Sequence, residues 1–159
     1  MPQPQFPLIS VGHDGILDVI INDAVFSKAS ARNLLDTALS NEIELFDSEF
    51  NKWKYQLIAE HLKDNWLTRL LAKTVYNPSF DTKIVWSFAG AYQTNELKEK
   101  IKECVDKDDD IITQFEEGAI IKTAIDKATG FDGILIVLNK YVFTVDEENL
   151  WNEQEARGE

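Results

Sequence analysis

The chain has 159 residues, of which 44% are hydrophobic and 28% are charged, a balance typical of one globular domain (residues 1–159) and not of a disordered chain. Its net charge of −12 argues against nucleic-acid or anionic-membrane partners, and no apolar run reaches the roughly 18 residues that span a bilayer. A single cysteine, Cys104, excludes an internal disulfide framework, and residues 1–5 lack the features of a secretory signal. A cytoplasmic location is therefore expected.

The charge is distributed unevenly along the chain. Residues 1–50 carry a net charge of −6, residues 51–100 carry +3, and residues 101–159 carry −9. An acidic excess of this size can create a negative field that speeds encounter with a basic protein. The alternative is that the charge serves solubility alone, because net charge by itself does not define a site.

Two β-hairpins are predicted in the first part of the chain. Pro7–Val11 and Ile16–Ile21 are β-prone and flank Gly12-His13-Asp14-Gly15, whose residues favour a tight turn. Glu42–Asp47 and Trp53–Ala59 both alternate between apolar and polar residues, which is typical of strands with one buried face. Each pair of segments is separated by a short polar stretch, as antiparallel neighbours require.

Helical spacing predicts two helices in this half of the chain. Ser27–Leu39 has apolar residues at helical intervals, and Asp64 or Asn65 is a candidate N-cap for a second helix. The second helix has one apolar face, which is expected to be buried. That face consists of Trp66, Leu67, Leu70, Leu71 and Val75.

The segment Thr82–Ala89 is predicted to be the central strand of the fold. Ile84, Trp86 and Phe88 alternate with residues that are also uncharged, so neither face of the strand carries a charge. A strand of this kind is typical of a sheet that is covered on both sides. The prediction is therefore a strand in the interior of the sheet, not at its edge.

The C-terminal half is predicted to be helical. Thr94 is a candidate N-cap for a helix over Asn95–Val105, in which Glu96 and Lys100 are spaced as an i,i+4 pair. The expected buried stripe of this helix consists of Leu97, Ile101, Cys104 and Val105. A second helix is predicted over Ala119–Ala128. Phe131–Phe143 fits both a buried strand and a helix, and its length favours a helix. Residues 146–159 form an acidic tail that is expected to fray. The fold class is α+β, with an antiparallel sheet, mainly from the N-terminal half and the Thr82–Ala89 strand, packed by helices.

The segment Asp106–Glu117 resembles a calcium-binding loop in part. Carboxylates stand at positions one, three, five and twelve, as a hard cation requires. At position six, however, Ile111 replaces the glycine of the sharp turn. The apolar Ile111, Ile112 and Phe115 also suit the start of a packed element. A solvated acidic connector is the leading interpretation, a calcium-binding module is the alternative, and no metal site is assigned.

Signals of catalysis are weak. His13 and His61 lie in separate predicted elements, and Cys104 lies on the apolar stripe of a helix, where a buried thiol is the expected role. No dinucleotide-binding, phosphate-binding, zinc-protease or paired-cysteine motif occurs. No catalytic residue and no cofactor is therefore predicted. A small enzyme with a site built from dispersed carboxylates and a histidine remains an alternative.

The residues proposed to bind a partner are acidic. One group lies on the predicted strand and turn near residue 45, and the other lies between two predicted helices near residue 110. If the two groups met in space, they would form one face for lysine and arginine side chains. The candidates are Glu42, Glu44, Asp47, Glu49, Asp108, Asp109, Asp110, Glu116 and Glu117.

Three stretches, Phe6–Gly15, Asp64–Leu71 and Glu96–Ile101, resemble segments of small bacterial α+β proteins. Some of these proteins resemble the immunity proteins encoded beside polymorphic or contact-dependent toxins. The resemblance implies a stoichiometric inhibitor that covers the active site of a toxin, often a basic nuclease. The leading functional prediction is therefore a non-enzymatic acidic protein that neutralises a basic protein partner.

Overall fold

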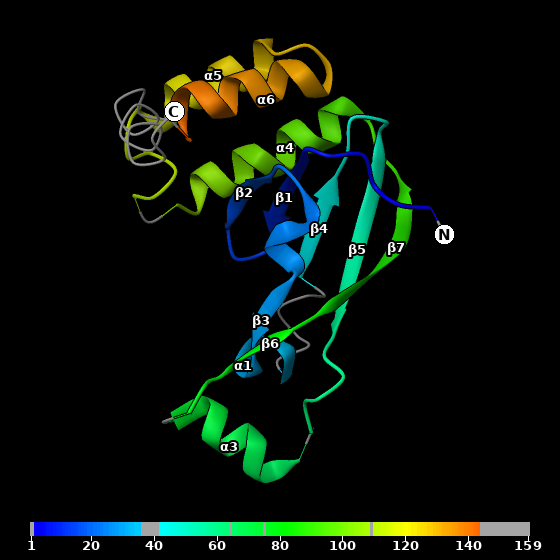
Figure 1. The fold of residues 1–159 in the computed structure, drawn as a ribbon. Coiled ribbons are helices and arrows are strands. Elements are labelled where there is room, and N and C mark those ends of the chain that lie inside the picture. Colours follow the sequence, from blue (N-terminus) through cyan, green and yellow to red (C-terminus); the bar gives the residue numbers. More distant parts are fainter. Residues whose placement is uncertain (1, 36–41, 64, 75, 109, 144–159) are drawn as a thin grey trace, which may run out of the picture.

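Five antiparallel strands form the main sheet, in the order β2-β1-β4-β5-β7 (Figure 1). The computed structural model describes residues 2–35, 42–63, 65–74, 76–108 and 110–143. The predicted α+β class is confirmed, as are both hairpins.

The strands are β1 Leu8–Gly12, β2 Leu17–Ile20, β3 Lys28–Ser30, β4 Ile43–Phe46, β5 Asn51–Ile58, β6 Ser79–Asp81 and β7 Lys83–Ala91. The helices are the 3-10 helix η1 Asp23–Phe26, α1 Ala31–Leu35, α3 Trp66–Thr74, α4 Thr94–Asp106, α5 Gly118–Lys127 and α6 Gly130–Tyr141.

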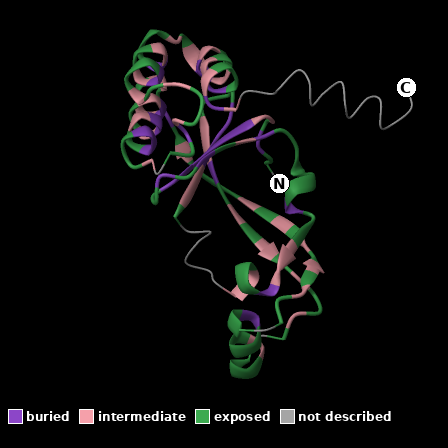
Figure 2. Ribbon diagram, turned by 90° about the vertical axis from the view of Figure 1, so that its left-hand side faces the viewer, coloured by how far each residue is buried: buried purple, intermediate pink, exposed green. Residues whose placement is uncertain are grey.

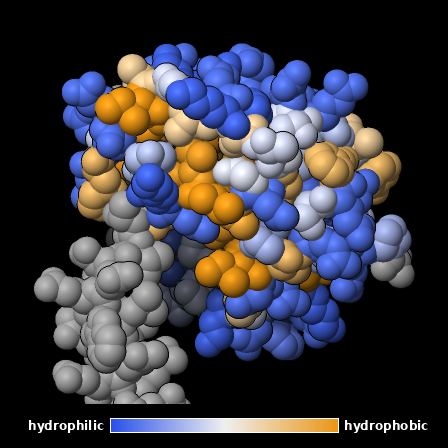
Figure 3. Space-filling view, turned by 90° about the horizontal axis from the view of Figure 1, so that it is seen from above, coloured by the Kyte–Doolittle hydropathy of each residue, from blue (hydrophilic) through white to orange (hydrophobic). Residues whose placement is uncertain are grey.

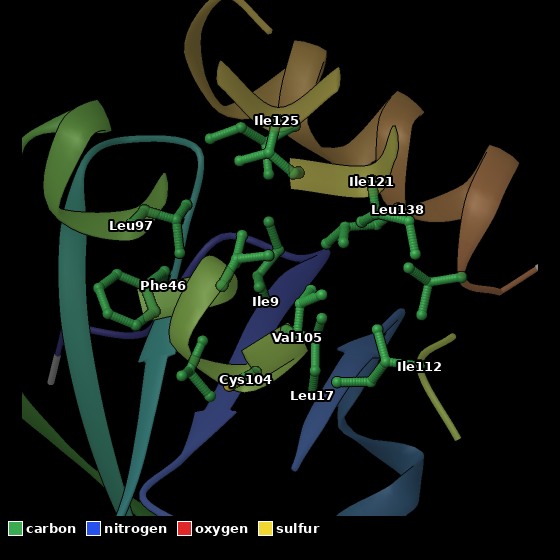
Figure 4. Packing of buried hydrophobic residues seen from close by; sticks show 14 of the residues in the cluster. Ile9, Leu17, Phe46, Leu97, Cys104, Val105, Ile112, Ile121, Ile125 and Leu138 are labelled. Atoms are coloured by element: carbon green, nitrogen blue, oxygen red, sulfur yellow. The ribbon is translucent and has the colours of Figure 1, made fainter. Parts of the chain in front are cut away.

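The larger core lies between one face of the sheet and helices α4, α5 and α6 (Figure 4). Ile9 and Phe46 point from the sheet toward α4, whose own buried stripe is the one predicted from the sequence. The segment Phe131–Phe143 is helical in α6, which confirms the choice of helix over strand. The stripe of α4 consists of Leu97, Ile101, Cys104 and Val105.

A second, smaller core lies on the opposite face of the sheet. Phe26, at the end of η1, packs against this face and makes an edge-to-face contact with Trp86, with ring centroids 5.4 Å apart. Such contacts add to the free energy gained by burying the rings themselves. The buried residues of this core are Leu8, Ile20, Phe26, Leu45 and Trp53. The sheet is therefore covered on both faces, but by different parts of the chain.

Helix α3 lies at the far end of the molecule from α4–α6, beyond the long β5–β7 ribbon (Figures 1 and 2). It packs on α1, where Arg32 donates to the carbonyl oxygens of Ala72 (3.2 Å) and Lys73 (3.1 Å). Asn65 caps it, because the side-chain oxygen accepts from the backbone N–H of Thr68 at 2.9 Å. Of the two N-cap candidates, Asn65 is confirmed and Asp64 lies outside the described residues.

The predicted burial of the apolar face of α3 is wrong. Trp66 is 75% exposed, and Leu67, Leu70 and Leu71 are exposed as well. Only Ala72 is buried in this helix, because α3 meets α1 through its small and polar side and presents its large side chains to solvent. Val75, the fifth member of the predicted face, lies outside the described residues.

Two further predictions are corrected. The segment Ser27–Leu39 is not one helix, because Lys28–Ser30 pairs with β6 and only Ala31–Leu35 is helical, while residues 36–39 lie outside the described part. The pairing partner of β3 is some fifty positions further along the chain, so local spacing does not show it. The strand predicted to be central is β7, which lies at the edge of the sheet.

Candidate partner-binding surface

Asp47 is a buried residue of the β4–β5 turn. Its Oδ2 accepts the indole N–H of Trp53 at 2.7 Å, and its Oδ1 accepts the backbone N–H groups of Glu49 (3.0 Å) and Asn51 (2.9 Å). No surface of the residue is exposed to solvent. The carboxylate therefore holds the turn together and does not face a partner, although its neighbour Glu49 is exposed.

Two ion pairs connect the sheet to α4. Lys100 pairs with Glu44 of β4, and Lys52 of β5 pairs with Glu96 at 2.9 Å. The hydrogen bond with Glu96 raises the pKa of Lys52 above its ordinary value, although burial opposes the shift. The i,i+4 spacing of Glu96 and Lys100 suggested that they pair with one another. In the structure each pairs with a residue of the sheet instead. Glu44 is largely neutralised within the fold.

The acidic candidates do not all form one face, because Asp47 lies at the start of α4 and the group near residue 110 follows its end. At the start of α4, the Tyr92 hydroxyl donates to the carbonyl oxygen of Asp47 at 2.7 Å. At its other end, the Lys107 ammonium donates to the carbonyl oxygen of His13 at 3.2 Å. The helix has 13 residues, so these ends are about 20 Å apart. Glu42, whose backbone carbonyl oxygen accepts the backbone N–H of His13 at 3.2 Å, belongs with the second end.

Asp108 builds the loop between α4 and α5. Its carboxylate accepts the backbone N–H groups of Ile111 (3.0 Å), Ile112 (2.9 Å) and Thr113 (2.8 Å), and also the Thr113 hydroxyl (2.8 Å). Burial alone would raise the pKa of this carboxyl, but the hydrogen bonds outweigh it and the pKa is lowered. Ile112 is only 3% exposed and extends from the loop into the larger core. The loop is therefore held in place at two points, by the hydrogen bonds of the Asp108 carboxylate and by the packing of Ile112.

We expect Asp108→Ala to lower the free energy of unfolding at neutral pH by about 2 kcal/mol, because it leaves backbone N–H groups without their charged acceptor. The pKa of Asp108 is lowered in the folded state, so its contribution is present above the ordinary carboxyl value of 3.8 and is lost as the pH falls through the folded value. Urea unfolding of the variant and of the wild type, at neutral pH and at about pH 3, would give the difference in the free energy of unfolding at each pH. The same difference at both pH values, or an equal loss in the exposed control Glu103→Ala, would contradict this role.

Apolar side chains of the same loop face solvent among carboxylates. Ile111 is 76% exposed and Phe115 is 55% exposed, although the sequence pattern suits packing for both. Asp110 and Glu117 are exposed beside them, Glu116 is half-buried, and Asp109 lies outside the described residues. A fixed loop with exposed apolar groups and an acidic surround is typical of a protein-binding surface.

The β1–β2 turn adjoins this loop. A Cβ atom at Gly15 would lie 3.0 Å from the Cβ of Lys107, and the φ angle of Gly15 is +91°, so the close approach requires glycine. The turn adds further exposed groups to those of the loop. We name the combined area the loop surface, and it consists of Asp14, Ile16, Glu42, Asp110, Ile111, Phe115 and Glu117.

A cleft of about 560 Å³ opens beside the loop surface, on the sheet face of the smaller core. Asp14 and Glu42 line it together with apolar groups of the sheet, among them Ile43, Tyr55 and Leu57. Its volume lies within the range of ligand-binding clefts, so it is large enough to receive side chains of a partner. The lining therefore contains both carboxylates and apolar groups.

The arrangement of the Asp106–Glu117 segment differs from that of a calcium loop. Asp106 pairs with Lys122 of α5 at 2.6 Å, and the Asp108 carboxylate accepts bonds from its own loop. The positive φ angle (+68°) falls at Asp110, one position before the glycine site of such a loop. Within the described part of the chain, no group of three or more His, Cys, Asp or Glu residues could hold a metal ion.

Cys104 is enclosed in the larger core. It is buried, and its Sγ lies 3.9 Å from the carbonyl oxygen of Ile16. Burial raises the pKa of the thiol to about 11, so the thiol is protonated at neutral pH and is a poor nucleophile. His13 lies in the β1–β2 turn and His61 in the connection after β5.

Other exposed apolar groups were not predicted from the sequence. Figure 3 shows apolar side chains among hydrophilic ones at the helical end of the molecule, where Ile120 and Ile136 are exposed. At the opposite end is the apolar face of α3. The signal for α3 was present in its apolar stripe, but a stripe alone does not show whether the partner belongs to the same chain.

No protein-family model, no curated protein and no solved structure matches the chain. In the described residues, none of the helices has the length and apolar character needed to cross a membrane. The function is therefore inferred from the residues and their geometry.

Proposed function

We propose that this protein is a non-enzymatic binding protein whose partner is a basic protein, held at the loop surface. The observation that carries the proposal is the exposure of Ile111 and Phe115 among carboxylates, in a loop that Asp108 holds in one conformation. Buried apolar anchors supply most of the affinity of a protein interface, and complementary charge speeds encounter and selects the partner. The loop surface offers both.

The more specific form of the proposal is an immunity protein that inhibits a bacterial toxin. It is supported by the sequence resemblance and by the net charge of −12, since many toxins that cleave nucleic acid are basic. Inhibition would be steric, with the loop surface lying over the active site of the toxin. The carboxylates would occupy positions that suit the phosphates of its substrate.

The first experiment is capture of partners from the source organism's lysate at low salt, followed by stepwise elution with salt and identification of the bound proteins. We expect one stoichiometric basic protein, with an affinity that weakens as salt rises. Phe115→Ala should weaken binding of that protein by about tenfold or more, because it removes an apolar anchor. Asp110→Asn combined with Glu117→Gln should slow association and reduce its salt dependence.

Trp66→Ala is the matched control, because Trp66 is also an exposed aromatic residue but lies on α3, at the other end of the molecule. It should leave the affinity unchanged. If the captured protein is toxic when expressed alone, co-expression with this chain should restore growth, and co-expression with the Phe115→Ala variant should restore less. Binding that does not depend on salt, or that is lost in Trp66→Ala and kept in Phe115→Ala, would contradict the proposal.

A further inference from the structure

Strand β7 is a long edge strand without the features that usually prevent edge-to-edge pairing. It has nine residues, and among the described residues it pairs only with β5, so its outer N–H and C=O groups have no strand partner. It contains no proline, and its one charged residue, Lys83, stands at its end. Charges, prolines and short length are the usual protections of an edge. The single irregularity is near Gly90, so Lys83–Phe88 is regular.

The surroundings of β7 favour a second copy of the same chain. The acidic excess that would keep two copies apart lies in residues 1–50 and 101–159, whereas residues 51–100, which include β5 and β7, carry a net +3. Two copies that approach by this edge therefore do not oppose their negative charges. Apolar side chains on both faces of β7 also contact water, since Phe88 is 57% exposed on one face and Val85 is exposed on the other.

We propose that two copies of this chain pair antiparallel through β7 and form one continuous sheet. A two-fold axis near Trp86 places Ile84 opposite Phe88 of the other copy and Val85 opposite Ser87. In this register no like charges face each other, and the exposed ring of Phe88 is covered by an apolar neighbour. Main-chain hydrogen bonds along the edge would provide the affinity, as in other cases of strand addition.

The test is the molar mass of the full chain in solution, measured by light scattering over a range of concentrations. We expect twice the chain mass of 18.2 kDa for the wild type. Val85 and Ser87 project from the exposed face of β7, so charged residues there remain in water and the chain can fold. Val85→Lys with Ser87→Lys should weaken the dimer by about tenfold or more, because lysines then oppose lysines across the axis. Val85→Glu with Ser87→Glu should do the same.

An equimolar mixture of the two double variants should recover the dimer, because each lysine then faces a glutamate of the other copy. Circular dichroism of each double variant alone would establish that the variant is folded. Leu70→Lys, on the exposed face of α3, is the control for apolar association elsewhere and should remain a dimer. A monomeric wild type overturns the proposal. So does a dimer that survives both double variants, a mixture of folded variants that does not dimerise, or a dimer lost in Leu70→Lys alone.

Discussion

Replacing Asp47 with alanine is expected to lower the free energy of unfolding by about 3 kcal/mol. The substitution leaves the indole N–H of Trp53 and the backbone N–H groups of Glu49 and Asn51 without an acceptor at the turn, and Trp53 is itself buried. A buried donor that loses a charged acceptor costs more than the bond contributed, because water cannot replace it. Urea unfolding followed by tryptophan fluorescence would measure the loss.

Two variants separate the hydrogen bonds from other effects at this turn. Asp47→Asn keeps one acceptor oxygen but turns an N–H₂ group toward some of the donors. It should therefore lower the free energy of unfolding measurably, but by less than Asp47→Ala. Glu49→Gln changes a neighbouring carboxylate that is exposed, so it should be within about 0.5 kcal/mol of wild type. Equal stability of Asp47→Ala and Glu49→Gln would show that Asp47 does not hold the turn.

The elements that were predicted correctly are those whose pattern is local. The hairpin of β1 and β2 follows from two β-prone runs around a four-residue turn, and the buried stripe of α4 follows from spacing within 13 residues. In each case the residues that decide the structure are neighbours in sequence, so the pattern contains the information. The same holds for α6, where length separated a helix from a strand.

The errors concern partners that are distant in sequence. Lys28–Ser30 is extended because it pairs with Ser79–Asp81, about fifty positions further along the chain. Strand β7 lacks charge on both faces, which is typical of a central strand, but the same pattern also occurs at an edge that has no protection. Strand order is set by contacts across the sheet, so the composition of one strand cannot establish it.

The acidic candidates were chosen by residue type, and the structure gives them different roles. Asp47 and Asp108 accept hydrogen bonds from the backbone of their own turns, and Glu44 pairs with Lys100. Only the exposed carboxylates, Asp110 and Glu117 among them, face solvent at the loop surface. Charge alone does not distinguish a carboxylate used within the fold from one left for a partner. Hydrogen-bond geometry makes that distinction.

Adjacent isoleucines of the α4–α5 loop offer a test of this division between fold and surface. Ile112→Ala is expected to lower the free energy of unfolding by about 3 kcal/mol, because Ile112 packs in the larger core and its removal leaves a cavity. Ile111→Ala removes the same atoms from the preceding residue, whose side chain faces solvent. The free energy of unfolding of this variant should stay within about 0.5 kcal/mol of wild type. Chemical unfolding of both variants in parallel would measure the two values.

The same pair also separates stability from binding. Ile111→Ala should weaken the complex with the basic partner while the chain remains as stable as wild type, because an exposed apolar group contributes to free energy only when a partner covers it. Ile112→Ala should weaken the complex only as far as the loop loses its conformation, and lower temperature should restore part of the binding. Equal losses of stability in the two variants would mean that Ile111 is packed in solution. In that case the loop surface would lose its principal anchor, and Phe115 alone could not support the proposed interface.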